Sequence, residues 1–599
     1  MERRLRADGW TAVDGVAVRG RAFDRGALLA DEALAARFRG AIEGAAPGEA
    51  LDALCDTADS LEGFFAAVVD APPEFERSAY LVADGARSIP LYYATDGTVV
   101  GDRGRVVREE TGSGRDPVAE SELLLTRYVT GSETVWSRVR VTQPGEVVAV
   151  GERGIEGRTY REHWPGVERA DSSTPAEDRV ARSDREARAL LRAGLETALD
   201  RTERIAEDRP IAVPLSGGHD SRLLAASLVG RGREVIGFSF GRVGHPDVEA
   251  SREVAAELGI EWHHVEYSSE DWRRWYHGEA CRSYREEAFA DALPFLAEWP
   301  AVRRLVSEDR IPSEVLVCPG HTVATPSERL PGFVGEAGAP DGGETGCGVP
   351  QEDDRGAEQE GVDPSVEGLV DHVLESHYTL WDWDDPRFEA AARERVRRGL
   401  LGGRDPDAID GPASAAAAYE RWEWRGRMAA FTNGDCRVYE DRGLDWWLPL
   451  WDPAYVRAWE RIWLEGRRGK RLHSELAVER YREVADLSRA RAARTDRTLP
   501  TIDRTLSLLR HTPERAFTER DGEWLPPFLA PRSRFGESGS HPLAWYGAVD
   551  PVLLDRLPDS RGFYALRALA ETGRIDFLDP SSPVPDGTVI ELPTDEGSD

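Results

Sequence analysis

The feature that most constrains this chain is the stretch PLSGGHDS at residues 214–221. A short β-branched run at residues 211–213 precedes it and predicts a buried strand. A helix-forming run at residues 222–228 follows it. A strand, a loop of small residues and a helix in this order direct backbone N–H groups and the positive end of the helix at one point. The stretch therefore predicts a phosphate-binding loop.

The small and polar residues of the loop suit a nucleotide. Gly217 and Gly218 let the backbone approach an anion closely, and Ser216 and Ser221 carry hydroxyl groups that can donate to it. Asp220 would repel a phosphate, so its carboxylate is expected to hold Mg²⁺ that bridges to the phosphates. The alternative is an ordinary Ser/Gly turn with a solvated aspartate. The flanking strand and helix favour the nucleotide site.

The loop resembles the pyrophosphate loop of the asparagine synthetase-like enzymes (asparagine synthase and beta-lactam synthetase), within the N-type ATP pyrophosphatases. Enzymes of that group cleave ATP between the α- and β-phosphates, adenylate a carboxylate and let an amine displace AMP. No Gly-Lys-Ser/Thr follows the loop, so transfer of the γ-phosphate is not expected. The resemblance implies ATP and Mg²⁺ as cofactors, Asp220 as a metal ligand, and backbone contacts from Leu215 and Phe240 to adenine.

The chain beyond the loop alternates between predicted strands and helices. Strands are predicted at residues 234–241 and 262–267, with a helix at residues 246–258 between them. This spacing predicts right-handed parallel crossovers, and therefore an α/β fold with a doubly wound parallel sheet. The resemblance implies a PP-loop ATP pyrophosphatase domain, adenine nucleotide alpha hydrolase-like, at residues 176–485.

A further strand is predicted at residues 314–318, and Pro319 and Gly320 follow it. The family has a second phosphate-contacting turn here, S-G-x-G-x-D-E, so both residues are expected to contact the nucleotide. The Asp of that motif is a magnesium ligand in the family, and Ala324 stands at its position in this chain. Glu328 is the nearest carboxylate that could replace it.

Two later tracts resemble parts of the family that carry catalytic residues. Residues 445–452 resemble E-x-R-x-P-F-L-D, with Asp445 at the Glu position and Trp447 at the Arg position. Residues 469–473 resemble the K-x-x-L-R tract, which implies that Lys470 is the catalytic lysine. Lys470 is the only lysine among 76 cationic residues, so a solvated surface lysine is the weaker explanation.

The first 165 residues contain short apolar runs separated by Gly and Asp, at 11–13, 63–70, 78–83, 90–94 and 145–150. This spacing predicts a β-rich layered domain. Residues 84–93 resemble the D-x-x-G-x-x-P-L-Y-Y element of the Ntn-hydrolase-like glutaminase domain in asparagine synthetases. That glutaminase needs an N-terminal cysteine, exposed after Met1 is removed. Glu2 stands there and Cys55 is the nearest cysteine, so residues 1–165 are expected to be a degenerate glutaminase-like domain.

The remaining segments are assigned from composition and pattern. Residues 335–363 are rich in Gly and acidic residues, which predicts a flexible surface insert. The pattern at residues 366–482 predicts helices, in which the tryptophans form core. Residues 486–599 are expected to be a linker and a C-terminal helical extension of the synthase domain.

Composition limits the partners and the setting. Asp and Glu number 109 against 76 Lys and Arg, a formal charge of −33. A dispersed acidic excess argues against a nucleic-acid partner. With almost no lysine, it favours a halophilic archaeon as the source over an acidic mesophile. Five scattered cysteines without a CxxC pattern fit a reducing cytosol and no cysteine metal site. No apolar run approaches the ~20 residues that span a bilayer, so a cytoplasmic protein is expected.

The sequence therefore predicts an asparagine synthase-like, AMP-forming amide ligase. Its partners would be a small-molecule carboxylate and ammonia or a small amine, without glutamine as its own nitrogen source. The alternative is a non-catalytic adenine-nucleotide-binding or scaffold protein of the same fold, which Ala324 and the lost glutaminase nucleophile would explain. The sequence makes no prediction of the oligomeric state.

Overall fold

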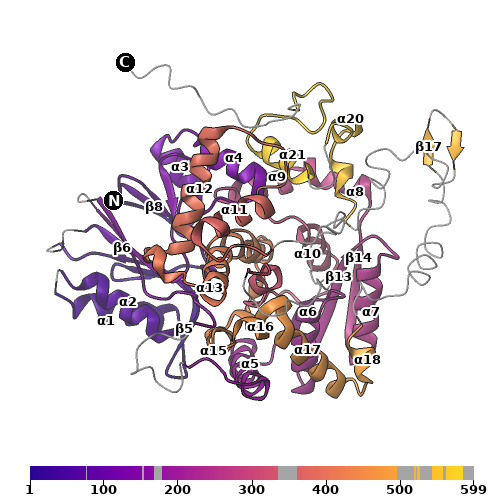
Figure 1. Cartoon of the computed structure of the whole chain (residues 1–599), viewed down its shortest axis with the longest axis horizontal. Helices are drawn as coiled ribbons and strands as arrows, with labels where there is room; N and C mark the ends of the chain where they lie inside the picture. The colour runs from indigo at the N-terminus through magenta and orange to yellow at the C-terminus, as the bar shows by residue number, and fades with distance from the viewer. Residues whose placement is uncertain are drawn as a thin grey trace.

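The computed structural model describes the chain apart from residues 47, 74, 76, 152–153, 168–178, 335–360, 495–517, 521–522, 526–542, 558–561 and 585–599. The described residues build a seven-stranded, a four-stranded and a five-stranded sheet, together with a two-stranded hairpin. Figure 1 shows the first two sheets in indigo and violet on one side of the molecule and the third in magenta on the other. Most of the predicted acidic insert, residues 335–360, and most of the predicted linker lie outside the described residues.

The seven-stranded sheet is antiparallel, in the order β11-β10-β6-β5-β3-β2, with β4 paired to β3. Its strands are β2 (Thr11–Val13), β3 (Val16–Asp24), β4 (Ala27–Ala30), β5 (Leu61–Asp70), β6 (Ala79–Ala83), β10 (Glu146–Gly151) and β11 (Gly154–Thr159). Side chains alternate along a strand, so β5 presents side chains to both faces of the sheet. Both sets are buried. Phe65 and Ala67 pack under α1 (Asp31–Glu43) and α2 (Ala50–Ser60), and Ala66 packs against the next sheet.

The four-stranded sheet has the order β1-β8-β7-β9. Its strands are β1 (Glu2–Arg4), β7 (Tyr92–Ala94), β8 (Val99–Gly101) and β9 (Val139–Val141). One face, with Tyr93 and Val100, packs on the seven-stranded sheet, while α3 (Gly104–Thr111) contacts β7 and β8. The first domain is thus layered as helix, sheet, sheet and helix. The predicted β-rich layering is confirmed, whereas the helical layers were not predicted.

The five-stranded sheet is parallel throughout, in the order β14-β13-β12-β15-β16. Its strands are β12 (Ile211–Pro214), β13 (Val235–Gly241), β14 (Glu261–Glu266), β15 (Leu316–Val317) and β16 (Asp445–Trp446). Helix α6 (His219–Gly230) packs on β12 and β13, and α7 (Pro246–Leu258) packs on β13 and β14. The chain runs outward from β12 in one direction and then returns to its other side with β15. This reversal confirms the predicted doubly wound sheet. Such sheets bind ligands at the carboxyl ends of the strands where the order reverses, which here is between β12 and β15.

Helices surround this sheet and join it to the first domain. They are α4 (Pro117–Thr126), α5 (Asp184–Ala206), α8 (Ser269–His277), α9 (Glu279–Ala288), α10 (Trp299–Ser307), α11 (Val366–His377), α12 (Pro386–Leu401), α13 (Pro412–Glu423), α14 (Cys436–Glu440), α15 (Pro453–Glu460), α16 (Leu464–Arg467), α17 (Arg471–Val484), α18 (Arg489–Ala492), α20 (Pro551–Leu554) and α21 (Gly562–Glu571). Trp422, Trp447, Trp451 and Trp459 are fully buried among them, as predicted. Among the described residues, no helix has both the length and the apolar character needed to cross a membrane.

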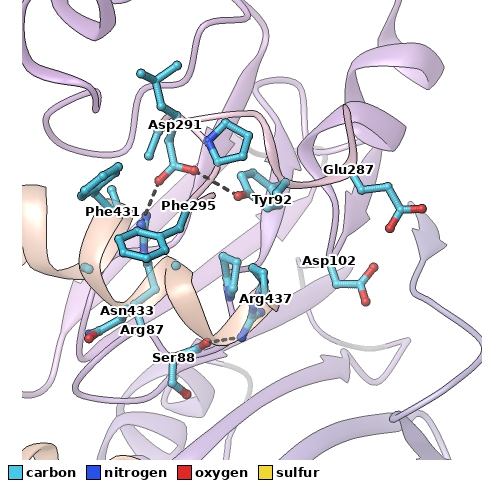
Figure 2. A pocket seen from close by; sticks show the side chains of 18 of the residues that line it. Arg87, Ser88, Tyr92, Asp102, Glu287, Asp291, Phe295, Phe431, Asn433 and Arg437 are labelled. Atoms are coloured by element: carbon cyan, nitrogen blue, oxygen red, sulfur yellow. Dashed lines mark hydrogen bonds and ion pairs between the residues drawn. The ribbon is translucent and has the colours of Figure 1, made fainter. Parts of the chain in front are cut away.

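A buried ion pair joins the two domains. Arg87, which stands at the Gly position of the D-x-x-G pattern, has a φ of 50° and extends its guanidinium to Asp291 at 2.8 Å. The Tyr92 hydroxyl donates to the same carboxylate at 3.0 Å. Figure 2 shows the three side chains meeting in a pocket at the junction, which Asn433 and Arg437 also line. Only 3% of Arg87 and 5% of Asp291 is exposed, so each charge depends on the other.

Replacing Asp291 by Ala should destabilise the junction strongly. The variant leaves the Arg87 guanidinium buried without its counter-charge, and breaking a buried pair in this way costs about 3–5 kcal/mol. Glu109→Ala is the matched control, because the Arg105–Glu109 pair is exposed and such pairs contribute about 0–1 kcal/mol. Urea unfolding followed by tryptophan fluorescence measures both. Equal, small losses in the two variants would show that the junction does not depend on this pair.

Candidate nucleotide-binding and catalytic site

The predicted phosphate loop lies at the carboxyl end of β12. Helix α6 begins directly after it, and its N-cap residue, Gly218, makes no side-chain cap. The first N–H groups of α6 are therefore not capped by a side chain and point toward the loop. Ser216 and Ser221 hold the loop closed, because the Ser221 hydroxyl oxygen accepts from Ser216 N at 3.0 Å and lies 3.1 Å from the Ser216 hydroxyl.

Two further segments meet this loop, as the sheet topology requires. Gly320, in the turn after β15, lies so close to Ser221 that a Cβ on Gly320 would be 2.7 Å from the Ser221 backbone nitrogen. From the other side, Asp247 at the start of α7 accepts from Gly217 N at 2.5 Å. The structure thus brings residues 216–221 together with the Pro319–Gly320 turn at the point where the strand order reverses.

The two residues expected to contact adenine lie at the carboxyl ends of the neighbouring strands. Leu215 N donates to the carbonyl of Phe238 at 2.7 Å, and the Leu215 side chain packs closely over Gly237. The Phe240 ring is stacked on Tyr267 with 5.6 Å between centroids. Both residues share the loop's edge of the sheet, and their contact with adenine stays a prediction.

Asp220 is the centre of a charged cluster. Its Oδ2 accepts from Lys470 Nζ at 2.8 Å, and its Oδ1 lies 2.9 Å from His473 Nε2. The other nitrogen of His473 lies 2.7 Å from the Tyr455 hydroxyl. Lys470 Nζ also lies 3.1 Å from Glu328 Oε2, and only 7–8% of these two side chains is exposed. The only lysine of the chain therefore bridges the loop carboxylate and the carboxylate that sequence reasoning considered as a replacement ligand.

The backbone places this lysine in an unusual way. Gly469 and Lys470 both have left-handed conformations, with φ of 59° and 56°, immediately before α17 begins at Arg471. A left-handed conformation costs a non-Gly residue roughly 1–2 kcal/mol. Such strain persists only where surrounding contacts impose it. His473 lies in the first turn of α17, and both it and Lys470 reach Asp220.

Charge and burial set the protonation states at the loop. Burial alone would raise the pKa of Asp220, but the Lys470 ammonium and the His473 hydrogen bond lower it overall, so Asp220 is a carboxylate. Burial and the nearby Arg222 lower the pKa of His219 to about 4. His219 is therefore neutral at neutral pH, and its buried Nε2 has no hydrogen-bond partner among the described residues. Sequence reasoning did not single out His219.

The structure does not bring Asp445 to this cluster, which corrects its predicted catalytic role. Asp445 pairs in register with Leu316, at the start of β15. Its carboxylate lies 2.7 Å from Arg21 and 3.0 Å from Arg209. Arg209 precedes β12, so Asp445 lies at the amino end of the sheet, opposite to the loop. The tract that resembled a catalytic motif instead joins the domains.

The residues present can be tested against Mg²⁺ and ATP. Among the described residues there is no group of three or more Cys, His, Asp or Glu side chains arranged to hold a metal. Mg²⁺ usually takes one or two carboxylates together with substrate phosphates. Asp220 and Glu328 are two such carboxylates, and the start of α6 carries no side-chain cap, whereas Gly217 N donates to the Asp247 carboxylate. Ala324 is fully buried. The role of Asp220 as a metal ligand stays a prediction.

The fold and site together define an α/β domain with a loop of small residues at the switch point of a parallel sheet, where such sheets bind ligands. Compared with known protein families, residues 190–308 match the family described as asparagine synthase. The match runs from within α5 to just past α10 and so includes the loop. No curated protein matches the chain. The family match points to an ATP-using enzyme of the ligase type.

The low pKa of Asp220 makes a stability prediction with a definite sign. A carboxyl group whose pKa is lower in the folded state stabilises above its unfolded pKa, and that contribution is lost as the pH falls. Asp220→Asn should therefore reduce the free energy of unfolding at pH 7, by about 1–3 kcal/mol for charge-assisted hydrogen bonds. The difference from the parent should shrink below about pH 4. Urea unfolding at a series of pH values measures it; a difference independent of pH would contradict the assignment.

Proposed function

We propose that this chain is an AMP-forming amide ligase, which uses ATP to adenylate a small-molecule carboxylate and then joins it to ammonia or a small amine. The observation that carries the proposal is the Lys470 ammonium held between Asp220 of the loop and Glu328 beyond the β15 turn. A buried ammonium on a flexible side chain lies here at the junction of the two turns proposed to contact phosphate. Such a group can stabilise negative charge that develops on an α-phosphate.

Each residue has a place in this scheme. The loop amides, the start of α6 and the Pro319–Gly320 turn bind the phosphates. Lys470 leaves its carboxylates and follows the negative charge of the α-phosphate as pyrophosphate departs. Mg²⁺, bound through Asp220 and the phosphates, would neutralise the leaving pyrophosphate. His473, fixed by Tyr455, keeps the Asp220 carboxylate oriented.

The first domain is proposed to be a scaffold without glutaminase chemistry. Cys55 is the one cysteine in residues 1–165 of the sequence. It lies within α2, and burial, with Asp56 and Asp59 nearby, raises the pKa of its thiol to about 12. A thiol that stays protonated is a poor nucleophile. The domain instead packs on the synthase part, where Phe64 meets Trp447 with 4.6 Å between ring centroids.

The alternative, a non-catalytic scaffold that binds adenine nucleotide, is favoured by the buried Ala324 at the second metal position. Two features of Lys470 argue against it. Its backbone is strained, and it is an ammonium where every other cation of the chain is Arg, which a site without chemistry would not need. The acidic surface further supports small-molecule partners rather than nucleic acid, and a salt-rich cytoplasm of a halophilic archaeon as the setting.

Magnesium should strengthen ATP binding through Asp220. Calorimetry in concentrated potassium chloride is expected to detect ATP binding that weakens when EDTA is added. In Asp220→Asn, ATP binding should weaken and lose its response to EDTA. Asp200→Asn, at an exposed position on α5, is the control. An undiminished EDTA response in Asp220→Asn would remove Asp220 from the metal site.

Lys470→Arg should fold and bind ATP but lose catalysis. A planar guanidinium cannot follow the α-phosphate as the compact ammonium does, so about 2–4 kcal/mol of transition-state stabilisation should be lost. Pyrophosphate release with a panel of carboxylates and ammonium measures this. Arg471→Lys, the reverse exchange at the next position, is the control. Near-parental release by Lys470→Arg would favour the scaffold alternative.

The chain should release no glutamate from glutamine. Burial keeps the Cys55 thiol protonated, and a carboxylate at position 2 lacks the acyl-exchange chemistry of a thiol. An enzymatic glutamate assay on the purified chain, with Cys55→Ala as the comparison, measures it. Glutamate above the blank that disappears in Cys55→Ala would restore a glutaminase role to this domain.

A further inference from the structure

The junction of the two domains contains a cavity that the scheme above does not use. Its volume is about 80 Å³, and Figure 2 shows the side chains around it. One water molecule needs about 10–15 Å³ of such space, so the cavity can hold a small organic molecule. The lining comes from the first domain, from the end of α9 with the segment after it, and from residues 429–441. Ligand sites lie preferentially at domain interfaces of this kind.

The inner wall of the cavity carries hydrogen-bond donors that the protein leaves unused. Arg87 and Arg437 each donate through a terminal guanidinium nitrogen, to Asp291 and to the Ser88 carbonyl, both at 2.8 Å. The buried Nε–H group of each arginine has no hydrogen-bond partner among the described residues. Buried polar groups are nearly always hydrogen-bonded, so these donors indicate a ligand that brings an acceptor. A carboxylate is a strong acceptor for a guanidinium group.

The same wall carries an acceptor that needs a donor. Asn433 is 2% exposed, and its Nδ2 donates to the Ala86 carbonyl at 3.1 Å, which fixes the orientation of the amide. Its Oδ1 is buried and has no partner in the part of the chain that the structure describes. An ammonium or a hydroxyl group would satisfy this oxygen. The wall therefore suits a carboxylate with a donor close by, as in an amino acid or a hydroxy acid.

The charges of the lining distinguish these two ligands. Three arginines and four carboxylates line the cavity, namely Arg6, Arg87, Arg437, Asp102, Glu287, Asp291 and Asp441. The lining therefore has a formal charge of −1, within a chain of formal charge −33. A hydroxy acid would add a net negative charge to this setting. An α-amino acid is a zwitterion at neutral pH and adds none, so the charges favour the amino acid.

The remaining lining limits the side chain and locates the entrance. Phe295 and Phe431, with 5.5 Å between ring centroids, line the cavity together with Leu293 and several alanines. Such a surface suits a short apolar side chain. Arg6 and Glu287 form an ion pair at 3.2 Å, with 27% and 45% of their side chains exposed. The cavity thus opens to solvent beside this pair.

We propose that the junction cavity binds a small apolar α-amino acid. Its carboxylate accepts from the guanidinium groups of Arg87 and Arg437, and its ammonium donates to Asn433. The ligand contacts the first domain through Arg87 and the residues around the parallel sheet through Asn433 and Arg437, so its binding holds the two domains together. None of the lining residues belongs to the nucleotide site, and the proposal does not depend on the ligase function.

Ligand-observed NMR titration of the full chain with L-alanine and L-valine tests the ligand class. Propionate and ethylamine are the matched probes, because each carries only one of the two charged groups of alanine. We expect both amino acids to bind, and propionate and ethylamine to bind about tenfold more weakly than alanine. That factor corresponds to the loss of one charge-assisted hydrogen bond.

Two variants test the place of binding. Ala288 lines the cavity at the end of α9, so the larger side chain of Ala288→Leu should fill the cavity and abolish binding. Ala280→Leu, at an exposed position near the start of the same helix, is the matched control and should bind as the parent does. Asn433→Leu removes the acceptor and should weaken binding about tenfold. Lys470→Arg, at the nucleotide site, should bind alanine with parental affinity.

The contrary outcomes are equally definite. Absence of amino-acid binding by the parent, or parental affinity in both Ala288→Leu and Asn433→Leu, would overturn the junction site. Propionate that binds as tightly as alanine would overturn the assignment of a zwitterion. Loss of alanine binding in Lys470→Arg would place the amino acid at the nucleotide site instead. These measurements need no turnover, so a failure of the ligase function in the pyrophosphate assay would leave the junction site standing.

Discussion

The site depends on one ammonium group between two carboxylates. Asp220 belongs to the loop after β12, Glu328 follows the turn after β15, and Lys470 comes from the segment before α17. Removing charges from water is costly, and a buried ion is tolerated only with partners close by. Lys470 therefore holds three parts of the chain, distant in sequence, at the switch point of the sheet. The same contacts explain how a left-handed lysine backbone is maintained.

The first domain supports this arrangement. The Arg87–Asp291 pair and the packing of Phe64 on Trp447 fix the first domain against the residues around the parallel sheet. At two positions where the family resemblance predicted Gly and Arg, this chain has Arg87 and Trp447. Arg87 stands in place of the Gly and Trp447 in place of the Arg, and each makes a contact between the domains. These contacts bind the first domain to the parallel-sheet part of the chain.

Much of the fold could be predicted because its signals are local. Strands β12 and β13 lie in apolar runs, and the helix between β13 and β14 was predicted with its observed bounds. The loop and Lys470 were found for the same reason, from neighbouring residues. Helices α1 and α2 were not predicted, because the β-like runs that flank them in the sequence favour strands.

The site could be predicted only in part because its geometry depends on distant pairing. Asp445 resembled a catalytic residue by its neighbours in sequence, but the two-residue strand β16 carries it to the amino end of the sheet. Glu328 was named only as a possible replacement, and no local pattern indicated that it meets Lys470.

The central claim is that the Lys470 cluster directs attack at the α-phosphate. Phosphorus-31 NMR of ATP incubated with the chain, Mg²⁺, ammonium and a panel of carboxylates tests it most directly. The account predicts that AMP and pyrophosphate appear in equal amounts, and only when a carboxylate substrate is present. Formation of ADP and inorganic phosphate, or ATP that stays intact with every carboxylate, would contradict it.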